Sequence, residues 1–238
     1  MNKQPRILII VPAYNEERNI ADTINEIRKN VPEVDILVVD DGSKDRTAAI
    51  AQELHAIVFS HAFNLRIGGA VQTGFKFARR EGYDIAIQVD ADGQHMPSFI
   101  PQLIQPIVQG ETDISIGSRY LGNGSVDSSL TRFLGVKFFS WLTTKVTKKR
   151  ITDCTSGFRA LNKRAISFFA NEYPLDFPDA EALILASRSG LRICEVPVKF
   201  RVRNRGESSL NLWRLLYYPI KETFSIVILL TKKQEKAD

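Results

Sequence analysis

Short runs of β-branched and aliphatic residues alternate with segments of helical periodicity along the first half of the chain. This alternation constrains the fold most, because consecutive parallel strands need long crossover connections, which are usually helices. The runs predicted as strands are residues 7–11, 36–39, 57–60, 85–89 and 114–116. They are almost wholly apolar, as in strands that helices cover on both faces. The sequence therefore predicts an α/β fold with a mostly parallel central sheet flanked by helices.

The composition excludes several other classes of protein. The chain has 238 residues, of which 44% are hydrophobic and 25% charged, as in an ordinary folded domain. Its two cysteines, Cys154 and Cys194, are far apart, so neither a disulfide framework nor a cysteine-rich zinc site is expected. The net charge of +5 is small and dispersed, which argues against a nucleic-acid partner.

Two further features concern the location of the protein. No secretory signal is recognisable at the start of the chain. The longest strongly apolar run, residues 224–230, is far shorter than the roughly 20 residues of a membrane span. We therefore expect a cytoplasmic protein that does not cross a bilayer.

Polar clusters follow three of the predicted strands. The first strand leads into Pro12-Ala13-Tyr14-Asn15-Glu16, the second into Asp40-Asp41-Gly42-Ser43, and the fourth into Asp90-Ala91-Asp92-Gly93-Gln94. In a parallel sheet, functional loops lie at the carboxyl ends of the strands. The sequence therefore predicts that these clusters share one edge of the sheet and form the site.

Asp90 and Asp92 supply two carboxylates on one turn. Such a pair suits a hard divalent cation that also bridges the phosphates of a ligand. Because carboxylate and phosphate oxygens satisfy magnesium or manganese, we expect the neighbouring His95 to lie on the loop surface rather than to bind metal.

Two adjacent acids follow the second strand. A turn or helix cap accounts for one of them, but not for both. A carboxylate at this position can accept from ribose hydroxyls or from a base N–H. Asp41 is the first candidate for this contact and Asp40 the second.

The glycines at positions 68, 69 and 74 do not form a phosphate-binding P-loop, since Phe75-Lys76 follows where that motif requires Lys and Ser or Thr. We expect Gly69 and its neighbours to permit close backbone approach and to open a helix whose N-terminus faces a nucleotide.

The second half of the chain carries further charged candidates. Arg201 and two more arginines precede Gly206-Glu207-Ser208-Ser209, and either close over a diphosphate or form a solvated edge strand. Asp179 and Glu181 stand near the start of a predicted helix, 179–189. One of them could act as a catalytic base, or both could only stabilise the helix through its dipole.

The ordered motifs VPAYNEE, VVDDGSKDRT, GGAVQTGF, QVDADGQH, GSRY, SGFRALN, DAE and RGESS resemble those of inverting glycosyltransferases of family 2. The similarity runs from residue 7 to about residue 216 and is greatest to the dolichol- or polyprenyl-phosphate sugar synthases. The resemblance implies a GT-A fold, a nucleotide-diphosphate sugar donor, either UDP- or GDP-linked, and Mg²⁺ or Mn²⁺ as cofactor.

The resemblance also implies roles for individual residues. Those implied to bind the nucleotide sugar are Pro12, Ala13, Tyr14, Glu16, Asp40, Asp41, Gly69, Asp90, Ala91, Gln94, Arg201 and Ser208. The metal would lie on Asp90, Asp92 and Gln94, and the catalytic candidates are Asp92, Arg119, Asp179 and Glu181.

The leading hypothesis is transfer of the sugar to a polyprenyl phosphate, whose phosphate is already an anionic nucleophile. The synthases usually have Lys where this chain has Ser209. A saccharide hydroxyl in cell-surface polysaccharide synthesis is therefore an alternative acceptor, and Asp179 or Glu181 would then serve as base. A non-catalytic nucleotide-sugar-binding protein is a second alternative.

The resemblance suggests a division of the chain. Residues 1–209 would form the GT-A domain, with a nucleotide-binding half, 1–118, and an acceptor half, 119–209. Residues 210–238 would form an amphipathic helical segment and tail, which either lies on the cytoplasmic membrane face or packs on protein. The predicted partners are the donor, a lipid-linked acceptor and the membrane surface, and a homo-oligomer is compatible with the sequence.

Overall fold

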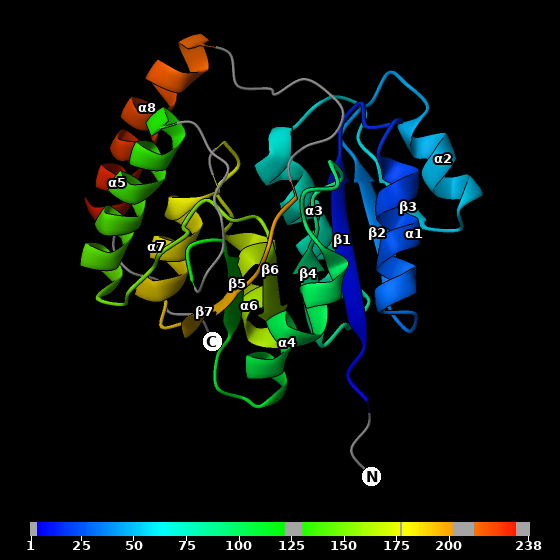
Figure 1. The fold of residues 1–238 in the computed structure, drawn as a ribbon, viewed down its shortest axis with the longest axis horizontal. Helices are drawn as coiled ribbons and strands as arrows, with labels where there is room; N and C mark the ends of the chain where they lie inside the picture. Colours follow the sequence, from blue (N-terminus) through cyan, green and yellow to red (C-terminus); the bar gives the residue numbers. More distant parts are fainter. Residues whose placement is uncertain (1–3, 122–129, 177, 202–211, 232–238) are drawn as a thin grey trace.

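The computed structural model contains a seven-stranded sheet flanked by helices (Figure 1). It describes residues 4–121, 130–176, 178–201 and 212–231, with only the backbone of residues 130–134, 212–220 and 222. The strands are β1 Ile7–Ala13, β2 Asp35–Asp40, β3 Ile57–Ser60, β4 Ile85–Gln88, β5 Ile114–Ser118, β6 Arg159–Asn162 and β7 Ile193–Pro197. The helices are α1 Ile20–Asn30, α2 Thr47–Glu53, α3 Arg66–Arg80, α4 Ile100–Val108, α5 Leu130–Thr147, α6 Lys163–Asn171, α7 Ala180–Arg188 and α8 Leu212–Thr231, with a 3₁₀ turn at Pro97–Phe99.

The five strands predicted in the first half are confirmed, and the strand order is β3-β2-β1-β4-β6-β5-β7. β1 pairs in parallel with β2 and β4, and β2 pairs in parallel with β3. Side chains of β1 enter two separate buried clusters: Leu8 and Ile10 join the one that includes α3, and Ile9 and Val11 join the one that includes α1. The side chains on both faces of β1 are apolar because helices cover both faces of the sheet.

Two strands in the second half differ from the sequence prediction. β6 was not predicted, and it runs antiparallel between β4 and β5. It has four residues, begins with Arg159 and lacks a repeating apolar pattern. The sequence of residues 191–202 also predicts a strand, but the observed one is shorter: β7 ends at Pro197, and Phe200 forms only an isolated bridge with His95.

Helix α3 packs closely on β1 because Gly74 has no side chain. A Cβ at Gly74 would lie 2.3 Å from Cγ2 of Ile10, so any larger residue would push the helix off the strand. Gly69 is buried in the first turn of α3, where its carbonyl accepts a hydrogen bond from Thr73 Oγ1 at 3.0 Å. The start of this helix near the glycines is as predicted, and its contact with a nucleotide stays a prediction.

Helices α5, α7 and α8 form a layer at one end of the molecule, beyond β7 (Figure 1). α7 packs against both α5 and α8. The helical patterns of the sequence at residues 131–147 and 179–189 agree with α5 and α7 to within one residue at each end. In the part of the chain that the structure describes, no helix combines the length and the hydropathy of a membrane span.

Candidate active site

The carboxyl ends of β1, β2 and β4 lie side by side at one edge of the sheet. β1 is paired with β2 as far as Ala13 and Asp40, and Ile10 of β1 is paired with Gln88 of β4. The segments that leave these strands carry the three predicted polar clusters. The parallel pairing therefore brings the clusters to a common edge, and Pro12 and Ala13 form the buried end of β1 there.

The Asp90 carboxylate is oriented by contacts from three segments of the chain. Gln88 Nε2 donates to Asp90 Oδ1 at 3.0 Å, and Nε2 of His95 lies 3.6 Å from Asp90 Oδ2. Gly157 approaches from the loop before β6, where a Cβ would lie 2.8 Å from Gln88 Nε2 and 3.0 Å from Asp90 Oδ2. A side chain at position 157 would therefore displace the carboxylate or the amide that holds it.

His95 is not on the loop surface, so that expectation is wrong. The residue is 4% exposed, its ring stacks on Phe158 with centroids 5.0 Å apart, and the edge of Phe200 packs against it at 4.8 Å. Its Nδ1 accepts a hydrogen bond from the backbone N–H of Asp90 at 3.0 Å. A nitrogen that accepts carries no proton, so the proton of neutral His95 is on Nε2, facing the Asp90 carboxylate.

The rest of the 90–94 turn is held by local hydrogen bonds. Asp92 Oδ1 accepts from the backbone N–H of Gln94 at 3.0 Å, and the carbonyl of the buried Ala91 accepts from Thr23 Oγ1 of α1 at 3.1 Å. Asp90 and Asp92 are both half-buried. The described residues contain no cluster of three or more His, Cys, Asp or Glu side chains that could hold a metal ion. Two half-buried carboxylates on one turn fit a hard divalent cation whose other ligands come from a bound phosphate and water.

The two acids after β2 have different partners. Asp40 Oδ1 accepts from the backbone N–H of Ser43 at 3.1 Å and closes the turn. Asp41 Oδ1 accepts from Nδ1 of His61 at 2.7 Å and from the backbone N–H of Leu65 at 2.8 Å. Both acids are buried, with 4% and 3% of their surface exposed. Asp40 therefore has a structural role in closing the turn. Asp41 connects the end of β2 to the segment that leads into α3.

The segment after β1 is fastened to the segment after β2. Backbone N–H groups of Asn15 and Glu16 donate to Ser43 Oγ at 2.9 Å and to Thr47 Oγ1 at 2.8 Å. The Glu16 carbonyl accepts the N–H groups that open α1, and its carboxylate accepts from Asn19 Nδ2 at 2.6 Å. Tyr14 is 45% exposed at the same edge. Tyr14 is thus available to a ligand, whereas the described contacts of Glu16 organise the start of α1.

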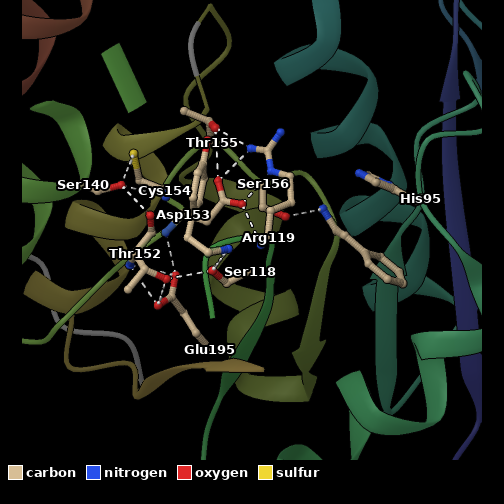
Figure 2. A network of polar contacts seen from close by, with 12 residues as sticks. His95, Ser118, Arg119, Ser140, Thr152, Asp153, Cys154, Thr155, Ser156 and Glu195 are labelled. Atoms are coloured by element: carbon tan, nitrogen blue, oxygen red, sulfur yellow. Dashed lines mark hydrogen bonds and ion pairs between the residues drawn. The ribbon is translucent and has the colours of Figure 1, made fainter. Parts of the chain in front are cut away.

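Arg119 follows β5 and is held in a buried ion pair. Its Nε and Nη2 donate to the two oxygens of Asp153 at 2.7 Å each, and Nη2 also donates to Thr155 Oγ1 at 2.8 Å (Figure 2). Burial acts to lower the pKa of Arg119, but the pairing with Asp153 outweighs it and raises the pKa. The guanidinium is therefore a permanent, rigidly placed positive charge.

Glu195 of β7 supports the loop that carries Asp153. Its carboxylate accepts from the backbone N–H groups of Thr152 and Asp153, at 2.9 and 2.8 Å, and from Thr152 Oγ1 at 2.8 Å (Figure 2). Burial raises the pKa of Glu195. Sequence reasoning missed both Asp153 and Glu195, because neither stands in a recognisable motif and only the fold brings them to Arg119.

Arg159 is a buried cation that sequence reasoning also missed. It is 4% exposed, and its guanidinium donates to the carbonyls of Ser156 at 2.8 Å, Cys154 at 2.9 Å, Pro178 at 3.1 Å and Asp179 at 3.1 Å. The last two bonds attach the start of α7 to β6. A signal was present in the sequence, since this arginine interrupts the otherwise apolar run Phe158-Arg159-Ala160-Leu161.

Asp179 lies near the other charged candidates. Together with closer partners, its charge contributes to the raised pKa of Arg119. Burial raises the pKa of Tyr173; Arg159 opposes this, and Asp179 and Asp90 reinforce it. Glu181 follows in the first turn of α7. The Asp179 carbonyl accepts from Arg159 at 3.1 Å, and the charge of Asp179 acts in the same direction as that of Asp153 on the pKa of Arg119.

Arg201 points elsewhere. Its guanidinium forms a forked ion pair with Glu26 of α1, at 2.6 and 2.7 Å, although its backbone N–H donates to the Gln94 carbonyl at 2.9 Å. The structure thus does not bring the Arg201 side chain to the carboxylates of the site. Ser208, predicted to bind the donor, lies outside the described residues.

Comparison with known proteins agrees with this arrangement. The family model of glycosyl transferase family 2 matches residues 8–168. The chain is 35% identical over 213 residues to a UDP-N-acetylglucosamine–dolichyl-phosphate N-acetylglucosaminyltransferase of Methanococcus voltae, covering 81% of this chain and 84% of that one. It is 33% identical over 218 residues to an undecaprenyl-phosphate mannosyltransferase of Micrococcus luteus, covering 87% and 88%.

The fold also matches solved structures. A glucosyl-3-phosphoglycerate synthase from Mycobacterium tuberculosis, solved with Mn²⁺, UDP and glucosyl-3-phosphoglycerate, superimposes with a TM-score of 0.73 at 20% identity, over 94% of this chain and 79% of that one. The fold class predicted from the sequence is therefore confirmed. The named relatives are catalysts, which favours an enzyme over the binding protein that the sequence left open. With the family model matched over residues 8–168 and the carboxylates at the strand ends, the chain belongs to glycosyl transferase family 2 and is a glycosyltransferase of the GT-A fold.

Proposed function

We propose that the enzyme transfers a sugar from a nucleoside-diphosphate sugar to the phosphate of a polyprenyl phosphate, with inversion at the anomeric carbon. A phosphate oxygen of the acceptor forms the new bond to the anomeric carbon while the bond to the donor's diphosphate breaks. The nucleoside diphosphate leaves with the bonding electron pair. The atoms and charges balance without a further reactant.

A single contact chain carries this proposal, because it couples a fixed cation to the carboxylate turn. The Arg119 guanidinium lies 4.9 Å from the centroid of Phe200, whose ring packs on His95 at 4.8 Å. His95 in turn binds the backbone of Asp90. A positive charge suited to phosphate is therefore linked through two rings, those of Phe200 and His95, to the turn suited to a metal-bound diphosphate.

Asp90 and Asp92 would hold Mg²⁺ or Mn²⁺, because they are the half-buried carboxylates of the turn, and the half-buried Gln94 is the further candidate ligand there. The bound cation would neutralise charge that develops on the departing diphosphate. His95 and Gln88 keep the Asp90 carboxylate oriented before any ligand arrives. The Mn²⁺ in the structurally similar synthase supports a divalent cation and leaves its identity open.

Arg119 would bind the acceptor phosphate. Its Nε and Nη2 are occupied by Asp153 and Thr155, and within the described residues no partner accepts from Nη1. That nitrogen remains available to a phosphate oxygen. Since an ionised phosphate is already a nucleophile, this reaction does not require a strong general base.

The relatives that act on dolichyl and undecaprenyl phosphate support a lipid acceptor. The surface of the α5–α7–α8 layer supports it as well. Phe224, Val227 and Ile228 of α8 are 66%, 52% and 55% exposed, and Phe138 and Trp141 of α5 are 47% and 56% exposed. We call these five residues the apolar face. With the exposed Lys145, Lys148 and Lys149 at the end of α5, it suits peripheral binding to an anionic, cytoplasmic membrane face.

A hydroxyl acceptor is a second candidate, favoured by one observation. Arg159 fixes the backbone of Asp179 within electrostatic range of Arg119. A carboxylate anchored there could accept a proton from a saccharide hydroxyl. The two acceptors are distinguished by whether activity depends on Asp179.

The test is transfer of labelled sugar from a panel of UDP- and GDP-sugars, with Mg²⁺ or Mn²⁺, into the organic-soluble fraction of a polyprenyl-phosphate mixture. We expect metal-dependent label in that fraction, at least about 100-fold less with Asp92→Asn, and no loss with Asp22→Asn, an exposed residue of α1. Sugar transfer to a saccharide, lost in Asp179→Asn, would establish the hydroxyl acceptor instead. Turnover that persists in Asp92→Asn would refute the assigned site.

A further inference from the structure

Asp41 presents its two carboxylate oxygens in different states. Oδ1 accepts two hydrogen bonds, from His61 Nδ1 at 2.7 Å and from the backbone N–H of Leu65 at 2.8 Å. Oδ2 accepts from none of the residues that the structure describes. The Asp41 side chain is 4% exposed, and the residue follows β2 at the strand-end edge with the rest of the site.

The proton on His61 Nδ1 follows from the partners of the ring. Nε2 lies 3.0 Å from Thr73 Oγ1, and that hydroxyl lies 3.0 Å from the Gly69 carbonyl. If the hydroxyl donates to Gly69, both ring nitrogens of His61 carry protons. If it donates to Nε2, the neutral ring has its proton on Nδ1. In both cases Nδ1–H donates to Asp41, so Oδ1 receives two N–H groups.

A carboxylate oxygen has two lone pairs, and those of Oδ1 are both used. We propose that His61 is a positioning residue that leaves Asp41 a single free acceptor, Oδ2, and that the enzyme thereby selects a uridine nucleotide. This inference rests on the proposed function, since it specifies the donor of that reaction.

The nucleobases differ in the donors that they bring to one carboxylate. Uracil offers one N–H, at N3, between two carbonyls. Guanine offers two parallel donors, N1–H and the 2-amino group, which pair with both oxygens of a free carboxylate. Against Asp41, one guanine donor would face the saturated Oδ1 and stay unpaired, and an unpaired buried donor is costly. The arrangement therefore matches uracil.

Three exposed apolar side chains stand on segments whose backbone meets Asp41 or its neighbours, and they offer a surface to a flat base. Phe63 and Leu65, on the segment that binds Asp41, are 69% and 40% exposed, and Tyr14 after β1 is 45% exposed. The segment is fixed in place, since a Cβ at Gly42 would lie 3.0 Å from the backbone of Phe63. Aromatic side chains of this kind bind bases by stacking, which adds affinity without selecting among bases. Selection is left to Asp41.

The first experiment measures dissociation constants of the purified enzyme for UDP, IDP, GDP and CDP in the presence of Mn²⁺ by calorimetry. We expect UDP to bind at least about tenfold more tightly than GDP. IDP is the informative ligand, because hypoxanthine is a purine with a single N–H; it should bind more tightly than GDP. In the pose of uracil, N3 of cytosine would place an acceptor against Oδ2, so CDP should bind more weakly than UDP.

Each outcome separates this inference from the proposed function. If no nucleoside diphosphate binds, the proposed function fails. If GDP binds as tightly as UDP, a glycosyltransferase remains but the inference is overturned. If IDP and GDP bind equally, the size of the base and not the number of its donors is selected, and the inference is again wrong.

Variants of His61 test its role directly. His61→Phe frees one lone pair of Oδ1 and should lower the ratio of the GDP to the UDP dissociation constant at least about fivefold. If His61 had only a structural role, the substitution would weaken the binding of both nucleotides by the same factor. His61→Asn retains an N–H donor near Nδ1 and should preserve the ratio. His55→Asn, at an exposed histidine with φ 53° that Asn tolerates, is the matched control. A ratio unchanged in a folded His61→Phe would overturn the assignment.

Discussion

His95 accepts a hydrogen bond from the backbone N–H of Asp90 at 3.0 Å, so an imidazole ring sets the conformation of the turn that bears the two carboxylates. The ring is held by its stack on Phe158 and by the edge of Phe200. The same Phe200 contacts Arg119. A series of ring contacts thus connects Arg119 to the carboxylate turn.

Removing the acceptor on His95 should impair the site more than the fold. His95→Phe keeps an aromatic ring against Phe158 but leaves the Asp90 N–H unpaired, which costs about 1–3 kcal/mol. We expect the dissociation constant for Mn²⁺ with nucleotide to rise about tenfold, measured by calorimetry. Wild-type affinity in this variant would show that the turn does not need the imidazole.

Gly157→Ala should reduce activity because the new Cβ would lie 2.8 Å from Gln88 Nε2 and 3.0 Å from Asp90 Oδ2. The carboxylate must shift to make room, and a displaced ligand typically costs tenfold to 100-fold in metal affinity or activity. The matched control is Gly135→Ala in α5, where no atom lies within 4 Å of the added Cβ. Equal turnover of the two variants, measured as label transfer, would contradict the prediction.

Asp113 should give the protein a measurable loss of stability in acid. Burial acts to raise its pKa, but hydrogen bonds from Arg192, including one from the backbone N–H at 2.7 Å, outweigh it and lower the pKa. The native state therefore binds fewer protons than the unfolded state, and stability falls as the pH drops below about 4, the ordinary value of an aspartate.

The corresponding variant is Asp113→Asn. We expect the free energy of unfolding at pH 7 to fall by about 1–3 kcal/mol and its decline below pH of about 4 to flatten, in urea titrations at several pH values. Asp22→Asn, at an exposed position, should keep the wild-type slope. An unaltered acid slope in Asp113→Asn would mean that other carboxylates cause the decline.

The apolar face should govern membrane binding and not chemistry. Replacing both Phe224 and Ile228, which are 66% and 55% exposed, with Ser should reduce flotation with anionic vesicles at least about tenfold, since each side chain loses the transfer free energy of an apolar group. Turnover with acceptor dissolved in detergent should be unchanged. Val108→Ser, at a 60% exposed position on α4, is the control. Flotation equal to that of the wild type would show that the apolar face does not bind the membrane.

The sequence alone determined the features that depend on local patterns. The apolar runs predicted β1 to β5, since strands covered on both faces need continuous apolar residues. It also predicted that the clusters at Tyr14, Asp41 and Asp90 share an edge, because parallel strands end together. The resemblance identified the family, which the comparisons bear out.

The tertiary structure decided everything that requires partners distant along the chain. β6 is short, charged at its first residue and antiparallel, so its position depends on pairing with β4 and β5 rather than on its own pattern. His95 was expected on the loop surface and His61 stands in no recognised motif, yet they contact Phe158 and Asp41, 63 and 20 residues away. Hydrogen bonds and ring contacts reach only a few ångströms, so which residues they join is decided by how the sheet and helices pack.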